Sequence, residues 1–253
     1  AGSVRGFARP LLERGVTVVS AWMANGLPVA EYCLAQTLLS LKHAWRLARG
    51  LHGPDAGPGD WHKDDGFPGA YDSTVGVVSL GVIGRRLVKL LQPFDLRVLA
   101  YDPFVPDDEI RALGAEPCEL ADLFRRSHVV SLQTPNLPQT RGMIDRALLT
   151  SMPRGATFLN SARGAVVNEA DLVEVLRKRP DLSAVLDVTN PEPPEAGSPL
   201  YTLPNVQLTP HLAGSAGREV LRMADFMIEE FDAWIAGRPL RYAVSLEQLE
   251  TMA

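Results

Sequence analysis

Short runs of apolar residues alternate along the chain with segments in which apolar residues recur at helical spacing. The apolar runs predict strands at Val75–Leu80, Arg97–Tyr101, His128–Leu132, Ala156–Asn160, Ser183–Asp187 and Val206–Thr209. Most of these runs are continuous, which is typical of strands that are covered on both faces. Strands that alternate with helices predict an α/β fold with a doubly wound parallel sheet. Such a sheet binds its ligand beyond the carboxyl ends of its strands.

Apolar stripes between these runs predict the helices. The stripes comprise Ile83, Leu87, Leu90 and Leu91, then Leu120, Leu123 and Phe124, then Leu172, Val175 and Leu176. A longer pattern predicts a buried helix over Val29–Leu51, and a last helix is expected over about Ala216–Ala236, before a Gly and Pro stop signal. The segment Gly53–Gly69 is rich in Gly, Pro and Asp and is expected to be a loop or hinge.

Composition narrows the class of function. The chain has 253 residues, of which 46% are hydrophobic and 22% charged, as in ordinary globular domains. A net charge of −5 gives no basic surface for nucleic acid or an anionic membrane. Cys33 and Cys118 lack the spacing of a metal site or a disulfide framework, and no apolar run approaches the roughly 20 residues of a membrane span. We expect small-molecule chemistry in a reducing cytoplasm, without metal.

A glycine loop joins the first predicted strand to the following helix, in the run Val75–Gly84. Gly81 would let the backbone approach a pyrophosphate at the positive end of that helix, and Gly84 would allow close helix packing. The dinucleotide fingerprint is GxGxxG, and Ser79 stands at its first glycine. A plain tight turn is therefore the alternative for this loop alone.

Asp102 follows the second predicted strand, where a carboxylate can accept hydrogen bonds from the ribose hydroxyls and repel the 2′-phosphate of NADP. Pro103 comes next, and Asp102 by itself is about as readily a turn or cap residue. The glycine loop and Asp102 together predict that the cofactor is NAD.

Three later residues each stand just past a predicted strand and so point to one edge of the sheet: Arg163, Glu192 and His211. Oxidation of an alcohol that carries a carboxylate needs a cation to hold the acid or carbonyl oxygen, a base for the hydroxyl proton and a carboxylate to orient that base. The three residues supply these groups. Taken singly, Arg163 could be a surface ion-pair partner and Glu192 a solvated loop charge.

His211 is the preferred base among the five histidines. A lone histidine is usually a hydrogen-bonded structural group, but Thr-Pro-His after an apolar strand presents its ring where the ligand should lie. The other candidates are placed elsewhere: His43, His52 and His62 in the helix or the Gly/Pro loop, and His128 at the start of an apolar strand, as a satisfied core residue.

These segments together resemble the D-isomer-specific 2-hydroxyacid dehydrogenases over nearly the whole chain. The matching motifs are Pro28-Val29-Ala30-Glu31, the modified glycine loop, Tyr101-Asp102-Pro103, Asn160 to Gly164, Leu186-Asp187-Val188, Glu192-Pro193 and Thr209 to Gly214. The resemblance implies a Rossmann-type fold with a second, flavodoxin-like substrate domain. It also implies a homodimer and hydride transfer between NAD and C2 of a D-2-hydroxy acid or 2-keto acid.

By this resemblance Arg163 would be the substrate-binding and catalytic arginine, Glu192 the carboxylate partner, His211 the acid/base and Asp187 a contact to the nicotinamide carboxamide. Glu192 and His211 together resemble the hydroxyacid branch and not formate dehydrogenase. The residues expected to contact the cofactor are Ser79, Gly81, Val82, Ile83, Gly84, Asp102, Thr134, Pro135, Ala162, Asp187 and His211.

Members of the family begin with a further half-domain of roughly 70 to 100 residues. The start of this chain resembles the end of that half-domain. We expect residues 1–28 to end the substrate domain, 29–214 to form the NAD-binding domain and 215–253 to form a helix and tail returning toward the substrate domain. Gly2 and Ser3 resemble the loop whose N–H groups bind the substrate carboxylate. Two functions stay open: an active dehydrogenase, or a catalytically weak NAD-binding module that dimerises without most of its substrate domain.

Overall fold

Seven parallel strands form one sheet with the order β3-β2-β1-β4-β5-β6-β7. The computed structural model describes residues 4–52 and 66–251. The strands are β1 (Ser73–Val78), β2 (Leu96–Tyr101), β3 (Glu116–Pro117), β4 (Val129–Leu132), β5 (Thr157–Asn160), β6 (Ser183–Leu186) and β7 (Val206–Leu208). Because β1 pairs with both β2 and β4, the winding of the chain reverses at β1. In such sheets the ligand binds beyond the carboxyl ends of the two strands at the reversal, which here are β1 and β4.

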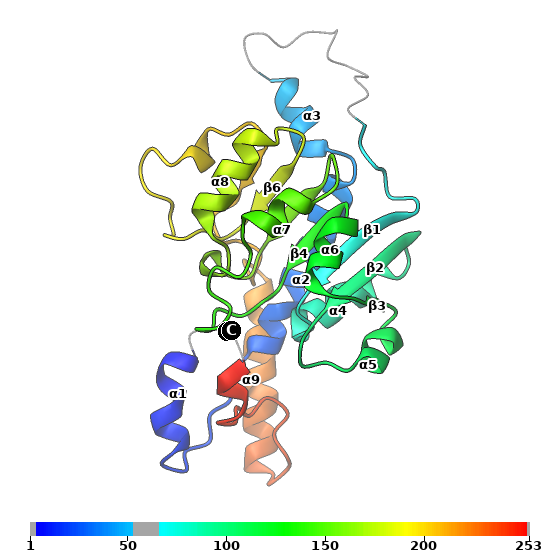
Figure 1. Cartoon of the computed structure of the whole chain (residues 1–253). Helices are drawn as coiled ribbons and strands as arrows, with labels where there is room; N and C mark the ends of the chain where they lie inside the picture. The colour runs from blue at the N-terminus through cyan, green and yellow to red at the C-terminus, as the bar shows by residue number, and fades with distance from the viewer. Residues whose placement is uncertain (1–3, 53–65, 252–253) are drawn as a thin grey trace.

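Helices cover both faces of this sheet. The α-helices of the described residues are α1 (Arg5–Leu12), α2 (Trp22–Ser40), α3 (Ala44–Gly50), α4 (Val82–Leu91), α5 (Asp107–Ala112), α6 (Leu120–Arg126), α7 (Arg146–Ser151), α8 (Glu169–Lys178), α9 (Glu219–Ile235) and α10 (Gln248–Thr251). Figure 1 shows α6, α7 and α8 in front of the sheet and α2 behind it. The expected Rossmann-type architecture is confirmed. None of the helices in the described stretches combines the length and apolar content needed to cross a membrane.

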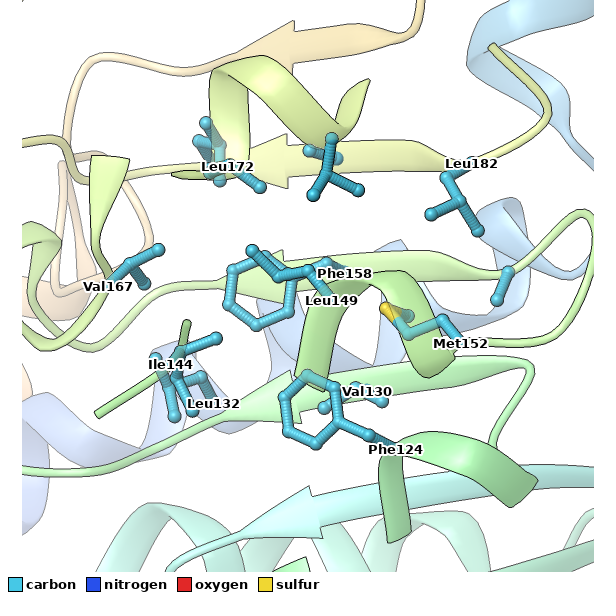
Figure 2. Close-up of a cluster of buried hydrophobic side chains, with 14 of the residues drawn as sticks. Phe124, Val130, Leu132, Ile144, Leu149, Met152, Phe158, Val167, Leu172 and Leu182 are labelled. Carbon is cyan, nitrogen blue, oxygen red and sulfur yellow. The ribbon is translucent and has the colours of Figure 1, made fainter. Parts of the chain in front are cut away.

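The core consists of two apolar layers, one on each face of the sheet. In the layer under α6, α7 and α8, the rings of Phe124 and Phe158 lie 6.3 Å apart, with Leu149 and Leu172 beside them (Figure 2). The other layer lies under α2 and α4 and contains Cys33 and other buried apolar residues. Burial on both faces explains why the strands are apolar throughout.

The six predicted strands all form, with ends shifted by one or two residues. The largest shift is at β1, which was predicted to run to Leu80 but ends at Val78. The reason is that Ser79 turns into the left-handed region, at φ 76°, so the strand cannot continue. The two-residue β3 and the six-residue helices α5 and α7 were not predicted, because elements this short carry little periodicity.

The helix predicted over Val29–Leu51 is wrong in its bounds. It begins at Trp22 and breaks after Ser40, and α3 follows as a separate helix. At the break His43 adopts φ 47°, and its buried ring bonds through Nε2 to the carbonyl oxygen of Gly155 at 2.7 Å. A contact so distant in sequence cannot be read from local periodicity. The last helix likewise starts three residues later than predicted, at Glu219.

Residues from near both ends of the described chain pack together beyond the sheet. A small apolar cluster joins Val4 and Ala8 to Val244 and Leu249, and Val19 pairs with Ala243. Figure 1 shows α1 and the C-terminal segment beside the lower part of α9. The buried carboxylate of Glu230 on α9 accepts hydrogen bonds from two consecutive backbone N–H groups of this segment. The segment is therefore held firmly to α9.

Candidate active site

The glycine loop has the geometry that a bound pyrophosphate requires. Helix α4 begins at Val82 as predicted, with Gly81 as its N-cap. A Cβ on Gly81 would meet nothing within 4 Å, so this side of the loop is open. The first N–H groups of a helix have no intrahelical acceptor and lie at its positive end, where they favour an anion. The residues present therefore fit the phosphate end of a dinucleotide.

Gly84 confirms the predicted close packing. A Cβ at this position would stand 2.1 Å from the carbonyl oxygen of Ser79, a distance no side chain can adopt. The first turn of α4 thus lies directly against the end of β1.

Ser79 adopts a backbone conformation that glycine favours, which explains why the fingerprint has a glycine at this position. Its φ is 76°, and its N–H donates to the carbonyl oxygen of Tyr101 at 2.7 Å. Its hydroxyl lies 2.8 Å from the hydroxyl of Thr134. The loop therefore keeps a fixed shape without its first glycine.

Asp102 is tied to the same loop. One carboxylate oxygen accepts from the N–H of Leu80 at 2.7 Å, and the other accepts from the N–H of Phe104 at 2.8 Å. Each oxygen has two lone pairs, so both retain capacity for a further donor such as a ribose hydroxyl. Asp102 stands at the carboxyl end of β2 as expected, while its contact with ribose stays a prediction.

Glu192 and His211 come together at the other half of the sheet edge. Nδ1 of His211 lies 2.5 Å from Oε1 of Glu192, and both side chains are partly exposed, at 49% and 39%. The contact at Nδ1 leaves Nε2 as the nitrogen that can face a substrate. The pair lies in the wall of a pocket of about 420 Å³. Its lining comprises Asp187, Thr189, Glu192, Pro193, Pro194, Tyr201, Leu208, Thr209, Pro210 and His211.

Asp187 organises the loop that carries His211. It is 2% exposed and accepts hydrogen bonds from the hydroxyl of Thr209 and from the N–H groups of Leu212 and Ala213, at 2.6, 2.9 and 3.0 Å. His211 itself sits in the left-handed region, at φ 52°. The carboxylate therefore fixes a loop shape that the backbone would not otherwise favour. Its expected contact with the nicotinamide carboxamide stays a prediction.

Arg163 follows β5, the neighbour of β6, but does not line this pocket. Burial lowers the pKa of its guanidinium, and the negative charge of Glu192 opposes that shift. The two groups are thus close enough to interact. Gly164 allows this approach, because a Cβ there would stand 2.0 Å from the backbone of Thr189. Gly164 therefore lets the Arg163 loop pack directly against the loop that leads to Glu192, as Gly84 lets α4 pack against the end of β1.

Comparison with known proteins decides the family. A sequence model described as the NAD binding domain of the D-isomer specific 2-hydroxyacid dehydrogenases matches residues 39–213. The chain belongs to this family. It carries the family's NAD-binding domain, and the expected cofactor, NAD, is confirmed.

Two curated members of the family illustrate the match. The chain is 31% identical over 240 residues to a D-3-phosphoglycerate dehydrogenase of Archaeoglobus fulgidus, covering 94% of this chain and 44% of that protein. It is also 31% identical over 238 residues to a glycerate dehydrogenase of Methylorubrum extorquens, covering 89% of this chain and 71% of that protein. The chain thus spans less than half of the first relative.

Solved structures of the family agree. D-mandelate dehydrogenase of Rhodotorula graminis superposes with a TM-score of 0.80 at 28% identity, over 94% of this chain and 71% of that one. A D-isomer specific 2-hydroxyacid dehydrogenase of Xanthobacter autotrophicus, in complex with NADPH and MES, gives 0.72 at 29% identity, over 92% of this chain and 93% of that one.

Within this dehydrogenase fold, sequence reasoning missed one residue beside the histidine loop. Tyr32 on α2 bonds to the hydroxyl of Thr209 at 2.8 Å. Thr209 donates its only hydroxyl hydrogen to Asp187, so Tyr32 must be the donor in this contact. Burial and the charge of Asp187 raise the pKa of Tyr32 to about 12. Tyr32 directly follows the motif Pro28 to Glu31, which was the one available signal.

His128 is a satisfied structural residue, as expected, since its Nδ1 accepts from the N–H of Thr74 at 3.0 Å and burial lowers its pKa. Gly2, Ser3 and His62 lie outside the described residues.

Proposed function

We propose that this protein is an NAD-dependent dehydrogenase that moves a hydride between the nicotinamide and C2 of a D-2-hydroxy acid or its 2-keto acid. The observation that carries the proposal is the contact of 2.5 Å between Nδ1 of His211 and Oε1 of Glu192. Arg163 interacts electrostatically with Glu192 as well. The family supports an oxidoreductase, and the names of the relatives, D-3-phosphoglycerate, glycerate and D-mandelate dehydrogenase, support a 2-hydroxy acid substrate.

In this mechanism each of the three side chains has one task. Arg163 binds the substrate carboxylate or carbonyl oxygen through its guanidinium N–H groups. Nε2 of His211 accepts the hydroxyl proton in oxidation and donates it in reduction, so the two directions need opposite protonation states of the ring. Glu192 accepts from Nδ1–H and fixes the tautomer. Bound NAD supplies the hydride acceptor, or donor in its reduced form.

The cofactor and substrate residues follow from the same proposal. The pyrophosphate would bind at Gly81, Val82 and Ile83, and the adenosine ribose at Asp102. Further cofactor contacts are proposed for Ser79, Gly84, Thr134, Pro135, Ala162, Asp187 and His211, and substrate contacts for Gly2, Ser3 and Arg163. We also propose that residues 1–28 and 215–253 belong with a substrate domain, that the protein is a cytoplasmic homodimer, and that Asp102 favours NAD over NADP.

A second candidate function is a catalytically weak, NAD-binding and dimerising module. The two candidates differ in turnover and agree in cofactor binding.

The experiment is a screen for NADH oxidation with glyoxylate, hydroxypyruvate, pyruvate and bulkier 2-keto acids. NADH binding with keto-acid-dependent turnover is expected, and His211→Ala should lower turnover by about 10²–10⁴-fold with NADH affinity little changed. Binding without turnover on any keto acid would favour the module, and wild-type turnover by His211→Ala would remove His211 from the mechanism. Light scattering on the same samples measures the proposed dimer.

A further inference from the structure

A pair of hydroxyl groups lies at the edge of the sheet where the winding of the chain reverses. Ser79 directly follows β1, and Thr134 lies just past β4, the strand that pairs with β1 on the other side of the reversal. Figure 1 shows these two strands side by side in the middle of the sheet. Their hydroxyl oxygens lie 2.8 Å apart, so the two strand ends are joined where the ligand of such a sheet binds.

The pair has one hydroxyl hydrogen more than its mutual bond uses. Two hydroxyls carry two hydrogens, and the bond between them uses one. Within the described residues, no hydrogen bond other than this one involves either hydroxyl. The second hydrogen is therefore available to an acceptor on a ligand.

The position of the two residues indicates which one holds that hydrogen. Thr134 is only 3% exposed, whereas Ser79 is half-buried. Ser79 also stands on the glycine loop, two residues before Gly81, at which a Cβ would meet nothing within 4 Å. Thr134 is thus placed to donate to Ser79, and Ser79 to donate outward.

We propose that the Ser79 hydroxyl donates a hydrogen bond to a pyrophosphate oxygen of the dinucleotide, with the Thr134 hydroxyl holding it in direction. The inference rests on the NAD binding in the proposed function and adds a side-chain donor to the backbone N–H groups of α4. A serine in the left-handed region costs more backbone free energy than glycine does. The bond to Thr134 offsets part of that cost.

The test measures binding of NADH, ADP-ribose and adenosine to the 253-residue chain by titration calorimetry, and needs no turnover. The variants are Ser79→Ala, Ser79→Gly and Thr134→Val. Loss of a hydrogen bond to a charged group predicts about tenfold weaker binding of NADH and of ADP-ribose in both Ser79 variants. Adenosine has no phosphate, so its affinity should not change. Thr134→Val leaves the Ser79 hydroxyl free to donate, and should weaken NADH binding less than Ser79→Ala does.

Thermal melting separates this role from a structural one. Ser79→Gly relieves the left-handed serine and should raise Tm, whereas Ser79→Ala keeps the strained backbone, loses the bond to Thr134 and should lower it. Weaker NADH binding in both variants, with Tm moving in opposite directions, supports the phosphate contact. Wild-type NADH affinity in either Ser79 variant, or an equal loss for adenosine, overturns it. If the unchanged chain binds neither NADH nor ADP-ribose, the proposed function fails and the phosphate contact with it.

Discussion

At the scale of single residues, two carboxylates that are proposed to contact the cofactor also shape the backbone around them. Asp102 bonds to the glycine loop through Leu80, and Asp187 bonds to three groups of the histidine loop. A carboxylate suits both tasks, because each oxygen accepts more than one hydrogen bond. Substitution of either residue is thus expected to alter the binding site as well as a contact.

Replacement of Asp102 should change both the strength and the selectivity of cofactor binding. Asp102→Ala removes the ribose acceptor and the repulsion of a 2′-phosphate, so NADH should bind about ten- to hundredfold more weakly and discrimination against NADPH should fall. Asp102→Asn removes the charge and keeps one carbonyl acceptor for the N–H groups of Leu80 and Phe104, while its NH2 group replaces the other acceptor. Dissociation constants for both cofactors measure the effect. An unchanged NADH to NADPH ratio in both variants would show that Asp102 does not select the cofactor.

Tyr32 should make stability fall at alkaline pH. Its pKa is raised from 10.0 to about 12 in the folded chain. The neutral form is favoured on folding, so its contribution is complete below pH 10 and is lost as pH rises toward 12. The loss is at most about 2–3 kcal/mol. Tyr32→Phe should show a shallower decline in the free energy of unfolding over this range, measured by urea denaturation.

Tyr71→Phe is the matched control for that measurement, because Tyr71 is 82% exposed. Its stability should follow the wild-type curve. The same Tyr32→Phe protein should exchange the amide hydrogens of Leu212 and Ala213 faster, since the loop loses its anchor on α2. Parallel pH curves for Tyr32→Phe and wild type would contradict the burial of this hydroxyl.

At the scale of elements, the glycines of α4 differ in what surrounds them. Gly84→Ala would drive a Cβ into the carbonyl oxygen of Ser79 at 2.1 Å, so the helix must shift, at a cost of about 1–3 kcal/mol. Gly81→Ala meets open space at φ −66°, which any residue adopts, and should change stability by no more than about 0.5 kcal/mol. Thermal melts of the two variants test this. Equal losses would mean that the contact at Gly84 is not tight.

The sequence predicts the strands that are buried on both faces well, and features that depend on tertiary contacts poorly. The apolar runs locate β1, β2 and β4 to β7, because burial on both faces leaves an unbroken signal. The break at His43 depends on Gly155, which lies far along the chain. Within the site, the pairing of Glu192 with His211 could be expected because both follow neighbouring strands. The bond between Tyr32 and Thr209 could not, since it joins a helix to a loop across the fold.

At the scale of the whole molecule, the position of β1 makes the cofactor crevice dependent on distant pairing. β1 pairs on one side with β2, the next strand in the chain. Its partner on the other side is β4, which follows only after β2 and β3. The glycine loop therefore lacks its contact with Thr134 until β4 has paired with β1.

This dependence has a consequence for the lifetime of the protein in the presence of a protease. Contacts between residues distant in sequence form late in folding, so partly folded chains should lack the dinucleotide crevice and NADH should recognise only the closed sheet. A ligand at a hundred times its Kd then adds about 2.7 kcal/mol to the free energy of unfolding. Where proteolysis proceeds through global opening, NADH should slow cleavage about a hundredfold. Unequal protection of sites in β2 and β4 would show that the two halves open separately.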